Sequence, residues 1–381
     1  MSNPQRHMTK RFFGFSLILL SVVFIASAAA QQPTARPKVI VDQDARGPAT
    51  TDIQSILMFA QSPDIDLLGV TIVTGDQWLK EEMVHTLRAL EIAGRSDIPV
   101  YMGAENPLVN SREESEFWEA QYGVLATKGA WTPTRDVKLP DGRVVHREYH
   151  APDVVPDLPE GMPTTKAQPE HAVDFIIRMV HQYPGEVTLW AGGPLTNIAL
   201  AIRKDPEVVS LAKQLVLMGS GFNVGMGGIH RINGRREFNW WFDPEAVRIV
   251  MSAPWKKITI TPVDISVKTR LSDQINNEIS KADTPLARYL KQYSRPSYMW
   301  DEIAAAAFMD PSIITDQKEM YVNIDIDHGA SYGQTIFVEK DVKVPGWWKL
   351  ATVQFDLNVD KFYQQYIRLM SLPTGAGKPK Q

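Results

Sequence analysis

Apolar runs alternate with helix-like segments along this chain, and that alternation constrains its fold more than any other feature. The runs at 38–42, 65–75 and 98–103 are nearly continuous in apolar residues, as strands covered on both faces are. The segments between them, 52–62 and 78–94, carry apolar residues at helical spacing. A strand–helix–strand repeat of this kind predicts an open, mostly parallel α/β sheet flanked by helices.

The alternation breaks between residues 106 and 166, where Pro, Gly, charged and aromatic residues mix without a period. A stretch of this length inside a domain is typical of a functional loop or an insertion. Further on, the pattern resumes and then changes to short strands that predict an antiparallel C-terminal part. We expect helices at 169–184, 194–206, 243–254 and 299–311, parallel strands at 186–193, 214–221 and 257–266, and antiparallel strands at 321–327, 334–340 and 350–358.

The N-terminus has the features of a targeting segment. A basic start precedes an apolar run at 12–26, and small residues follow it. This order predicts a signal peptide over 1–30, cleaved after Ala30, and hence a periplasmic or secreted protein. The alternative is a retained signal that anchors the chain, which is the only membrane contact we expect. A tether at 31–37, one domain at 38–372 and a flexible tail at 373–381 complete the predicted organisation.

Composition narrows the classes of function. The 381 residues are 44% hydrophobic, which is enough for a sizeable core, and the net charge of −4 gives no reason to expect nucleic-acid binding. The chain has no cysteine. Disulfides, lipid attachment at a lipobox and thiolate chemistry are therefore excluded, and any metal site must use oxygen or histidine ligands.

Acidic side chains follow several predicted strands. Asp42 and Asp44 lie at the end of the first strand, Asp76 follows the second, and Asp264 comes near the end of a later one. Because ligands bind at the carboxyl ends of strands in open α/β sheets, we expect these acids at one rim. Carboxylates without basic neighbours suit a hard divalent cation. For Asp52, just before an apolar helical segment, an N-cap role is the alternative.

The segment "INGRREFNWWFDPEA" combines groups that suit a sugar. Glu237 and Asn239 offer an acceptor and an amide, and Trp240 and Trp241 offer apolar faces; a place in the core is the alternative for both tryptophans. Asp243 precedes Pro244 and is interpreted as an N-cap. Histidines on predicted helices are poorly placed for catalysis. Three others, in irregular segments, stay open as proton donors: His146, His150 and His230.

Seven segments, in order, make the chain resemble the inosine/uridine-preferring nucleoside hydrolase family. The first is similar to that family's D-x-D-P-G-x-D-D motif, and the likeness extends over about residues 38–316. The segments are "VIVDQDARGPATTDIQSIL", "AGRSDIPVYMGAENPL", "EHAVDFI", "GPLTNIALAI", "EFNWWFDPEA", "PVDIS" and "DEIAAAAFMDPSIIT".

The resemblance implies a Ca²⁺-dependent enzyme that hydrolyses the N-glycosidic bond of ribonucleosides. By motif position, Asp44 would be general base and Ca²⁺ ligand. Asp52, Asp301 and the carbonyl of Gly192 would complete the protein ligands. Calcium would activate a water, and the sugar would pass through an oxocarbenium-like transition state.

The same resemblance implies that Glu237 and Asn239 bind ribose hydroxyls, and it places Asp76 where the family has a ribose-facing Asn. The amide that precedes Glu237 in the family corresponds to Arg231 or, with a small shift, to Asn233, and we take Asn233 as the candidate.

The chain departs from the family at three other points. "ARGPATT" makes the spacing from Asp44 to Asp52 three residues longer, Thr51 replaces an Asp that binds ribose, and Trp300 replaces a His linked to protonation of the leaving base. Trp300 could stack on a substrate but could not protonate it.

These departures leave two alternatives to a ribonucleoside hydrolase: a hydrolase of another pentoside or a modified nucleoside, and a weakly catalytic periplasmic protein that binds sugars or nucleosides. In each case the expected partner is a small molecule. A homo-oligomer stays open as well.

Overall fold

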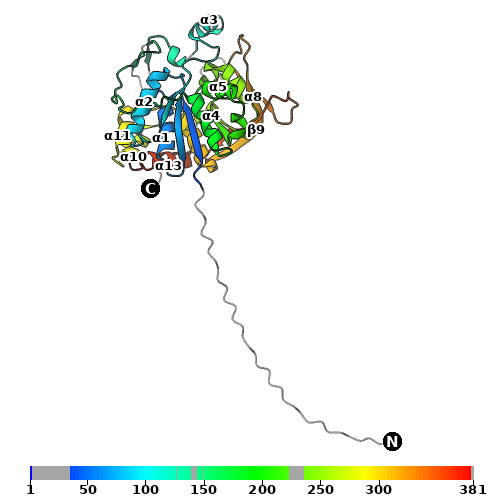
Figure 1. Cartoon of the computed structure of the whole chain (residues 1–381). Coiled ribbons are helices and arrows are strands. Elements are labelled where there is room, and N and C mark those ends of the chain that lie inside the picture. Colours follow the sequence, from blue (N-terminus) through cyan, green and yellow to red (C-terminus); the bar gives the residue numbers. More distant parts are fainter. Residues whose placement is uncertain (2–34, 126, 139–143, 148, 223–235, 379–381) are drawn as a thin grey trace. The chain divides into compact units, whose positions relative to one another are not determined.

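A computed structural model describes the chain except for residues 2–34, 126, 139–143, 148, 223–235 and 379–381 (Figure 1). From Arg36 onward the chain forms one compact unit. The predicted signal peptide and Asn233 lie outside the described residues. Among the helices described, none is both long and apolar enough to cross a membrane.

Within the described part, nine strands form one sheet in the order β10-β9-β11-β8-β7-β6-β1-β2-β3. The seven strands from β11 to β3 are parallel, and β9 pairs antiparallel with both β10 and β11. This confirms the predicted fold, including the antiparallel C-terminal strands. The strands are β1 Lys38–Gln43, β2 Asp66–Ile72, β3 Val100–Met102, β6 Val187–Ala191, β7 Gln214–Met218, β8 Ile258–Thr261, β9 Ile314–Ile324, β10 Thr335–Glu339 and β11 Leu350–Leu357.

Alternate side chains of the central strands enter two separate cores. Along β1, Val39 and Val41 pack in one core and Ile40 in the other, as the two-residue period of a strand requires. Helices α1, α12 and α13 cover the first face, and α4, α5 and α8 cover the second, where Figure 1 shows them together. The helices are α1 Thr51–Gln61, α2 Leu79–Ile92, α4 Ala172–Gln182, α5 Thr196–Lys204, α6 Val208–Leu211, α7 Phe238–Phe242, α8 Pro244–Ser252, α9 Val263–Ser266, α10 Asp273–Ser280, α11 Pro285–Tyr293, α12 Trp300–Met309 and α13 Val359–Met370.

The stretch predicted to be irregular, 106–166, contains regular structure. It includes helix α3 (Arg112–Tyr122), the 3₁₀ turn η1 (Gly129–Trp131), and a hairpin of β4 (Arg135–Lys138) with β5 (Val144–Arg147). Its aromatic residues explain why this part orders without a long period: Trp118 and Trp131 pack with Phe238, Trp241 and Phe242 of the α7 region. The insertion is thereby fixed beside the carboxyl ends of the strands.

The C-terminal residues also pack on the domain. The N–H of Gly375 donates to the carbonyl of Ala93 at 2.9 Å, and the N–H of Lys378 donates to the carbonyl of Gly375 at 3.0 Å. The segment expected to be a flexible tail is therefore held as far as Lys378. Helix α13 before it was not predicted, although its amphipathic pattern places Phe362 and Tyr366 in the core.

Strand β1 is the point where the chain order of the sheet reverses. From β1 the chain first adds β2 and β3 on one side, and later adds β6, β7 and β8 on the other. A crevice outside the carboxyl ends of two strands forms at such a point. The loop after β1 and the loop after β6 meet there, because Asp42 pairs with Ala191 in register.

Candidate active site

Asp44 is the first residue beyond β1 and lies buried at this switch point. Its Oδ2 accepts a 3.0 Å hydrogen bond from the N–H of Asp76, beyond the end of β2. A Cβ on Gly75 would lie 2.2 Å from that oxygen, and one on Gly193 would lie 2.9 Å from Oδ1. Both neighbours must therefore be glycine for the carboxylate to occupy this place.

Asp52 and Asp301 lie in the first turns of α1 and α12, and both are buried. Asp52 does not cap α1, because Thr50 holds that position; instead its Oδ2 accepts a 2.8 Å bond from the Thr50 hydroxyl. Oδ1 of Asp301 is buried without a hydrogen-bond partner in the described structure. A Cβ on Gly192 would lie 2.9 Å from this oxygen. The structure thus brings together the four predicted metal-binding residues.

Thr51 joins these two helices. Its hydroxyl oxygen accepts a 3.0 Å bond from the N–H of Asp301 and donates to Oε2 of Glu302 at 2.5 Å. The hydroxyl is therefore already used in holding α1 against α12. It fixes the separation of the two helix starts that carry Asp52 and Asp301.

Burial and mutual repulsion dominate the electrostatics. Burial raises the pKa of Asp44 and of Asp52 well above the usual range, and neighbouring carboxylates raise both further. The pKa of Asp301 is raised to about 8, again chiefly by burial. Arg46 lowers the pKa of Asp52, but this one guanidinium does not balance three buried acids. An orphaned buried oxygen amid carboxylates fits a hard divalent cation such as Ca²⁺.

The mutual distances of potential ligand atoms give a further comparison of the acidic groups in the structure. Among the described residues, the group that places three potential metal ligands all within 4.8 Å of one another is His181, Asp205 and Glu207 on the surface. The buried aspartates do not all meet that distance. Asp44, Asp52 and Asp301 therefore stay predicted ligands.

The predicted backbone ligand, the carbonyl of Gly192, accepts a 2.5 Å hydrogen bond from Nδ2 of Asn239. A carbonyl oxygen has two lone pairs, so this bond leaves one for a cation. Asn239 thus reaches the site and orients the Gly192 carbonyl. Its expected contact with a ribose hydroxyl stays a prediction.

Glu237 is buried and caps α7. Its carboxylate accepts bonds from the N–H groups of Asn239 at 2.9 Å, and of Trp240 and Ser220 at 3.1 Å each. Burial nevertheless raises the pKa of Glu237 to about 7. Trp240 and Trp241 are 0% and 1% exposed and belong to the packed interior. The expectation that their faces meet a sugar is therefore wrong, and the core alternative holds.

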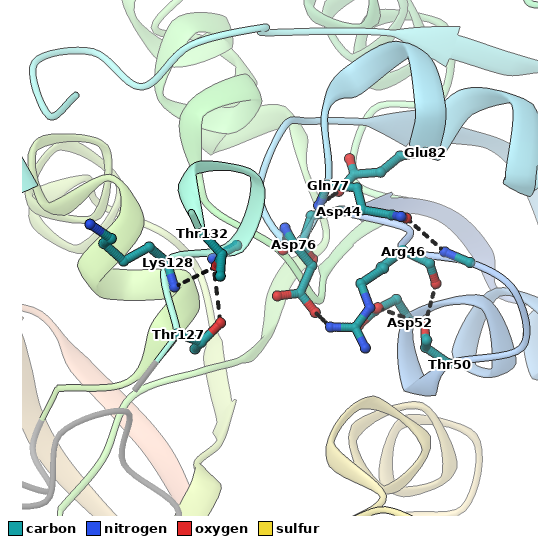
Figure 2. A network of polar contacts seen from close by, with 12 residues as sticks. Asp44, Arg46, Thr50, Asp52, Asp76, Gln77, Glu82, Thr127, Lys128 and Thr132 are labelled. Atoms are coloured by element: carbon teal, nitrogen blue, oxygen red, sulfur yellow. Dashed lines mark hydrogen bonds and ion pairs between the residues drawn. The ribbon is translucent and has the colours of Figure 1, made fainter. Parts of the chain in front are cut away.

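Asp76 and Trp300 lie at the partly exposed margin. The side chain of Asp76 is 23% exposed and lies 3.5 Å from the guanidinium of Arg46 (Figure 2). Trp300 is half-buried at the start of α12, packs against the core, and has its ring 5.1 Å from that of Tyr298. Of the histidines left open, His150 pairs with Glu81 at 3.0 Å. His230 and the side chain of His146 lie outside the described residues.

Two residues near the acids were missed by the sequence analysis. Glu82 of α2 is fully buried, its Oε2 has no hydrogen-bond partner in the described structure, and burial raises its pKa well above the usual range. Arg46 lies in the extended loop after Asp44. For Arg46, the sequence signal was the longer spacing between Asp44 and Asp52. No sequence feature indicated Glu82, because an acid in the first turn of a helix is ordinarily a favourable surface residue.

Comparison with known proteins identifies the family of this chain. Residues 39–364 match the family model described as inosine-uridine preferring nucleoside hydrolase. The chain belongs to the inosine-uridine preferring nucleoside hydrolase family. The resemblance seen in the sequence is confirmed.

Curated relatives and solved structures agree with this membership. Uridine nucleosidase 1 of Arabidopsis thaliana is 30% identical over 74% of this chain and 76% of the relative. Inosine-uridine preferring nucleoside hydrolase of Crithidia fasciculata is 29% identical over 78% and 87%. The structure of a purine-preferring ribonucleoside hydrolase from Gardnerella vaginalis has a TM-score of 0.68 at 21% identity, and the match covers 89% of this chain and 99% of that one. The nucleoside hydrolase fold is thereby shown.

Membership of this family establishes the class of reaction. The chain is a hydrolase that acts on N-glycosyl compounds, and its substrate is a small-molecule nucleoside. The predicted enzyme class is confirmed. The roles of individual site residues stay predictions.

Proposed function

We propose that the chain is an exported, calcium-dependent hydrolase that cleaves ribonucleosides to ribose and free base. The observation that carries the calcium proposal is the trio of buried aspartates, with the unpartnered Oδ1 of Asp301, beside the Gly192 carbonyl at the switch point. Asp44, Asp52, Asp301 and Gly192 would hold the ion. When bound, calcium supplies Lewis-acid activation of a water molecule.

In this proposal, Asp44 takes the proton of the attacking water. Its carboxylate is held by the N–H of Asp76 and by the close approach of Gly75 and Gly193. The water oxygen forms a bond to the anomeric carbon as the bond from that carbon to the base nitrogen breaks. The base nitrogen keeps the electron pair and takes up a proton from solvent, and the sugar carries positive charge in the transition state. The surrounding carboxylates stabilise that charge.

The departures on the substrate side support a second candidate within the same reaction class, a hydrolase of another pentoside or a modified nucleoside. The observation in its favour is that the Thr51 hydroxyl is bonded to Glu302 and to the Asp301 backbone. The names of the relatives differ in base, from uridine and inosine-uridine to purine, and therefore leave the preferred base open. A weakly catalytic binding protein is disfavoured, because binding alone does not need a carboxylate positioned as a base.

A screen of nucleosides for released sugar, run with calcium and with excess chelator, tests the proposal. Ribose release from at least one natural ribonucleoside, abolished by chelator and restored by calcium, is the expected result. Release of another pentose alone would favour the second candidate. Release unaffected by chelator would contradict calcium dependence.

Export is proposed from the basic and apolar pattern of residues 1–30. Expression of the full chain in a bacterial host, followed by N-terminal sequencing of the periplasmic fraction, tests it. A mature protein that begins at Gln31 is expected. An uncleaved chain in the membrane fraction would instead support the anchor.

A further inference from the structure

The extended loop between Asp44 and α1 is tightly fixed. The N–H of Gly47 donates to Oε1 of Gln77 at 3.0 Å, and the N–H of Ala49 donates to the hydroxyl of Tyr289 at 2.8 Å. A Cβ on Gly47 would lie 2.1 Å from the ring of His85. The backbone that carries Arg46 is therefore held from several sides, and its side chain leaves from a defined position.

Arg46 presents donors to the site. Its Nη1 lies 3.5 Å from Oδ2 of Asp76, a long ion pair whose side chains are 29% and 23% exposed. Figure 2 shows the guanidinium between Asp76 and Asp52. A guanidinium has five N–H donors, and within the described structure this contact with Asp76 is the hydrogen bond that the Arg46 side chain makes. Most of its donors are therefore available to a substrate.

The neighbouring polar groups are less available. The Thr51 hydroxyl is bonded to Glu302 and to the backbone of Asp301. Glu237 is buried and accepts three backbone N–H groups. Next to the aspartate trio, Arg46 and Asp76 are thus a partly exposed donor–acceptor pair with unused hydrogen-bonding capacity.

We propose that Arg46 and Asp76 together recognise a sugar hydroxyl and determine which sugar is accepted. The Asp76 carboxylate accepts the O–H, and the Arg46 guanidinium donates to a lone pair of the same or the adjacent oxygen. A hydroxyl can use both partners because it donates and accepts, whereas an anionic group would meet the repulsion of Asp76 and of the acids behind it. The pair thus selects neutral nucleosides over nucleotides. This inference rests on the proposed function, whose sugar it specifies.

Arg46→Gln tests the pair, with Arg178→Gln as matched control because Arg178 pairs with Glu170 on the exposed surface. For a ribonucleoside, kcat/KM should fall roughly 10- to 100-fold in Arg46→Gln, the range for a hydrogen bond to a charged group. The control should not change. The 2′-deoxy and 3′-deoxy substrates each lack one hydroxyl. For the substrate that lacks the recognised hydroxyl, the variant and the native enzyme should have the same kcat/KM. An equal loss on all three substrates would overturn the inference.

Three further measurements separate this result from other causes. Calcium affinity, measured by calorimetry, should be unchanged or tighter in Arg46→Gln, because a positive charge near Asp52 has been removed; weaker calcium binding would place the effect on the metal and overturn the inference. The inference would also be overturned if the native enzyme preferred a 5′-nucleotide to the nucleoside and the variant lost that preference.

Binding of free ribose tests the pair even if no nucleoside is cleaved. Ribose should bind more strongly to the native protein than to the variant. Absence of nucleoside cleavage would then count against the proposed function alone, and equal binding of ribose to native and variant protein would count against the inference.

Discussion

The backbone N–H of Asp76 donates to the carboxylate of Asp44 at 3.0 Å and so couples the ends of β1 and β2. The bond orients the acid by main chain rather than by a mobile side chain. Gly75 lies directly beside it, where a Cβ would come within 2.2 Å of the same oxygen. The position of the Asp44 carboxylate is therefore fixed by the backbone at the carboxyl ends of β1 and β2.

Asp44→Asn is predicted to remove the base while keeping the local structure. The amide oxygen can still accept from the Asp76 N–H, but the side chain cannot take a proton from water. The kcat should fall by roughly 10²–10⁴-fold, the usual range for losing such a group. Steady-state kinetics, with calcium content and substrate binding measured alongside, checks this. Full turnover in a calcium-loaded variant would show that another residue is the base.

Calcium is predicted to stabilise the protein through the buried trio. A cation that binds the native state alone raises the unfolding temperature. Asp52→Ala should reduce the calcium-dependent shift, whereas Asp205→Asn, in the surface group of His181, Asp205 and Glu207, should leave it intact. Scanning calorimetry with and without calcium measures both. A shift lost in Asp205→Asn but kept in Asp52→Ala would move the calcium site to the surface.

The sheet and the gathering of the aspartates could be predicted because they follow from short-range pattern. Apolar runs identify the strands, and parallel strands bring their carboxyl ends to one rim, so Asp44 and Gly192 had to come close. Asp301 is different. It lies on a helix far along the chain, and only the family resemblance placed it there.

The contacts on the substrate side could not be predicted from the sequence. The same side chain can contact either a substrate or the protein, and tertiary packing decides between the two. Trp240 and Trp241 suit a sugar face and a core equally well in sequence, and only packing against the insertion places Trp241 inside. Thr51 carries a hydroxyl that could face a ligand, but α12 supplies Glu302 as its partner. The Arg46–Asp76 pair depends on the conformation of the loop after Asp44. The extra length of that loop in the sequence did not indicate where the Arg46 side chain would lie.

Glu237 gives a prediction about pH. Burial raises its pKa to about 7 in the folded protein, against 4.5 for an exposed carboxyl. Its neutral form therefore contributes stability fully below pH about 4.5, and this contribution is lost as pH rises through about 7. Glu237→Gln stays neutral and should gain on the order of 2–3 kcal/mol in free energy of unfolding over the native protein between pH 5 and 8.

Urea denaturation in excess chelator, with both proteins at each pH, measures this difference. Other titrating groups are shared and cancel. Glu116→Gln, on the exposed face of α3, is the control and should show no such gain. A difference between Glu237→Gln and native protein that stays constant from pH 5 to 8 would show that burial does not perturb Glu237.

The last prediction concerns Trp300, which cannot protonate a leaving base because an indole N–H only donates hydrogen bonds. Its half-buried ring lies beside Tyr298, just before Asp301. If the ring stacks on the substrate, Trp300→Phe should keep most activity and Trp300→Ala should lose much of it, since aromatic pairs contribute about 0.5–1.5 kcal/mol beyond burial. Trp300→His should raise cleavage of inosine by adding a titratable group.

The substrate used distinguishes stacking from packing. A nitrophenyl riboside has a good leaving group that needs no proton, so native enzyme should already cleave it well, and Trp300→His should improve inosine alone. If Trp300 only packs against the core beside α1 and α13, Trp300→Ala should instead lower the free energy of unfolding by roughly 3–5 kcal/mol and reduce activity on both substrates equally. Thermal stability measured beside the two activities separates these outcomes. A stable Trp300→Ala variant with unchanged activity on both substrates would remove Trp300 from the site.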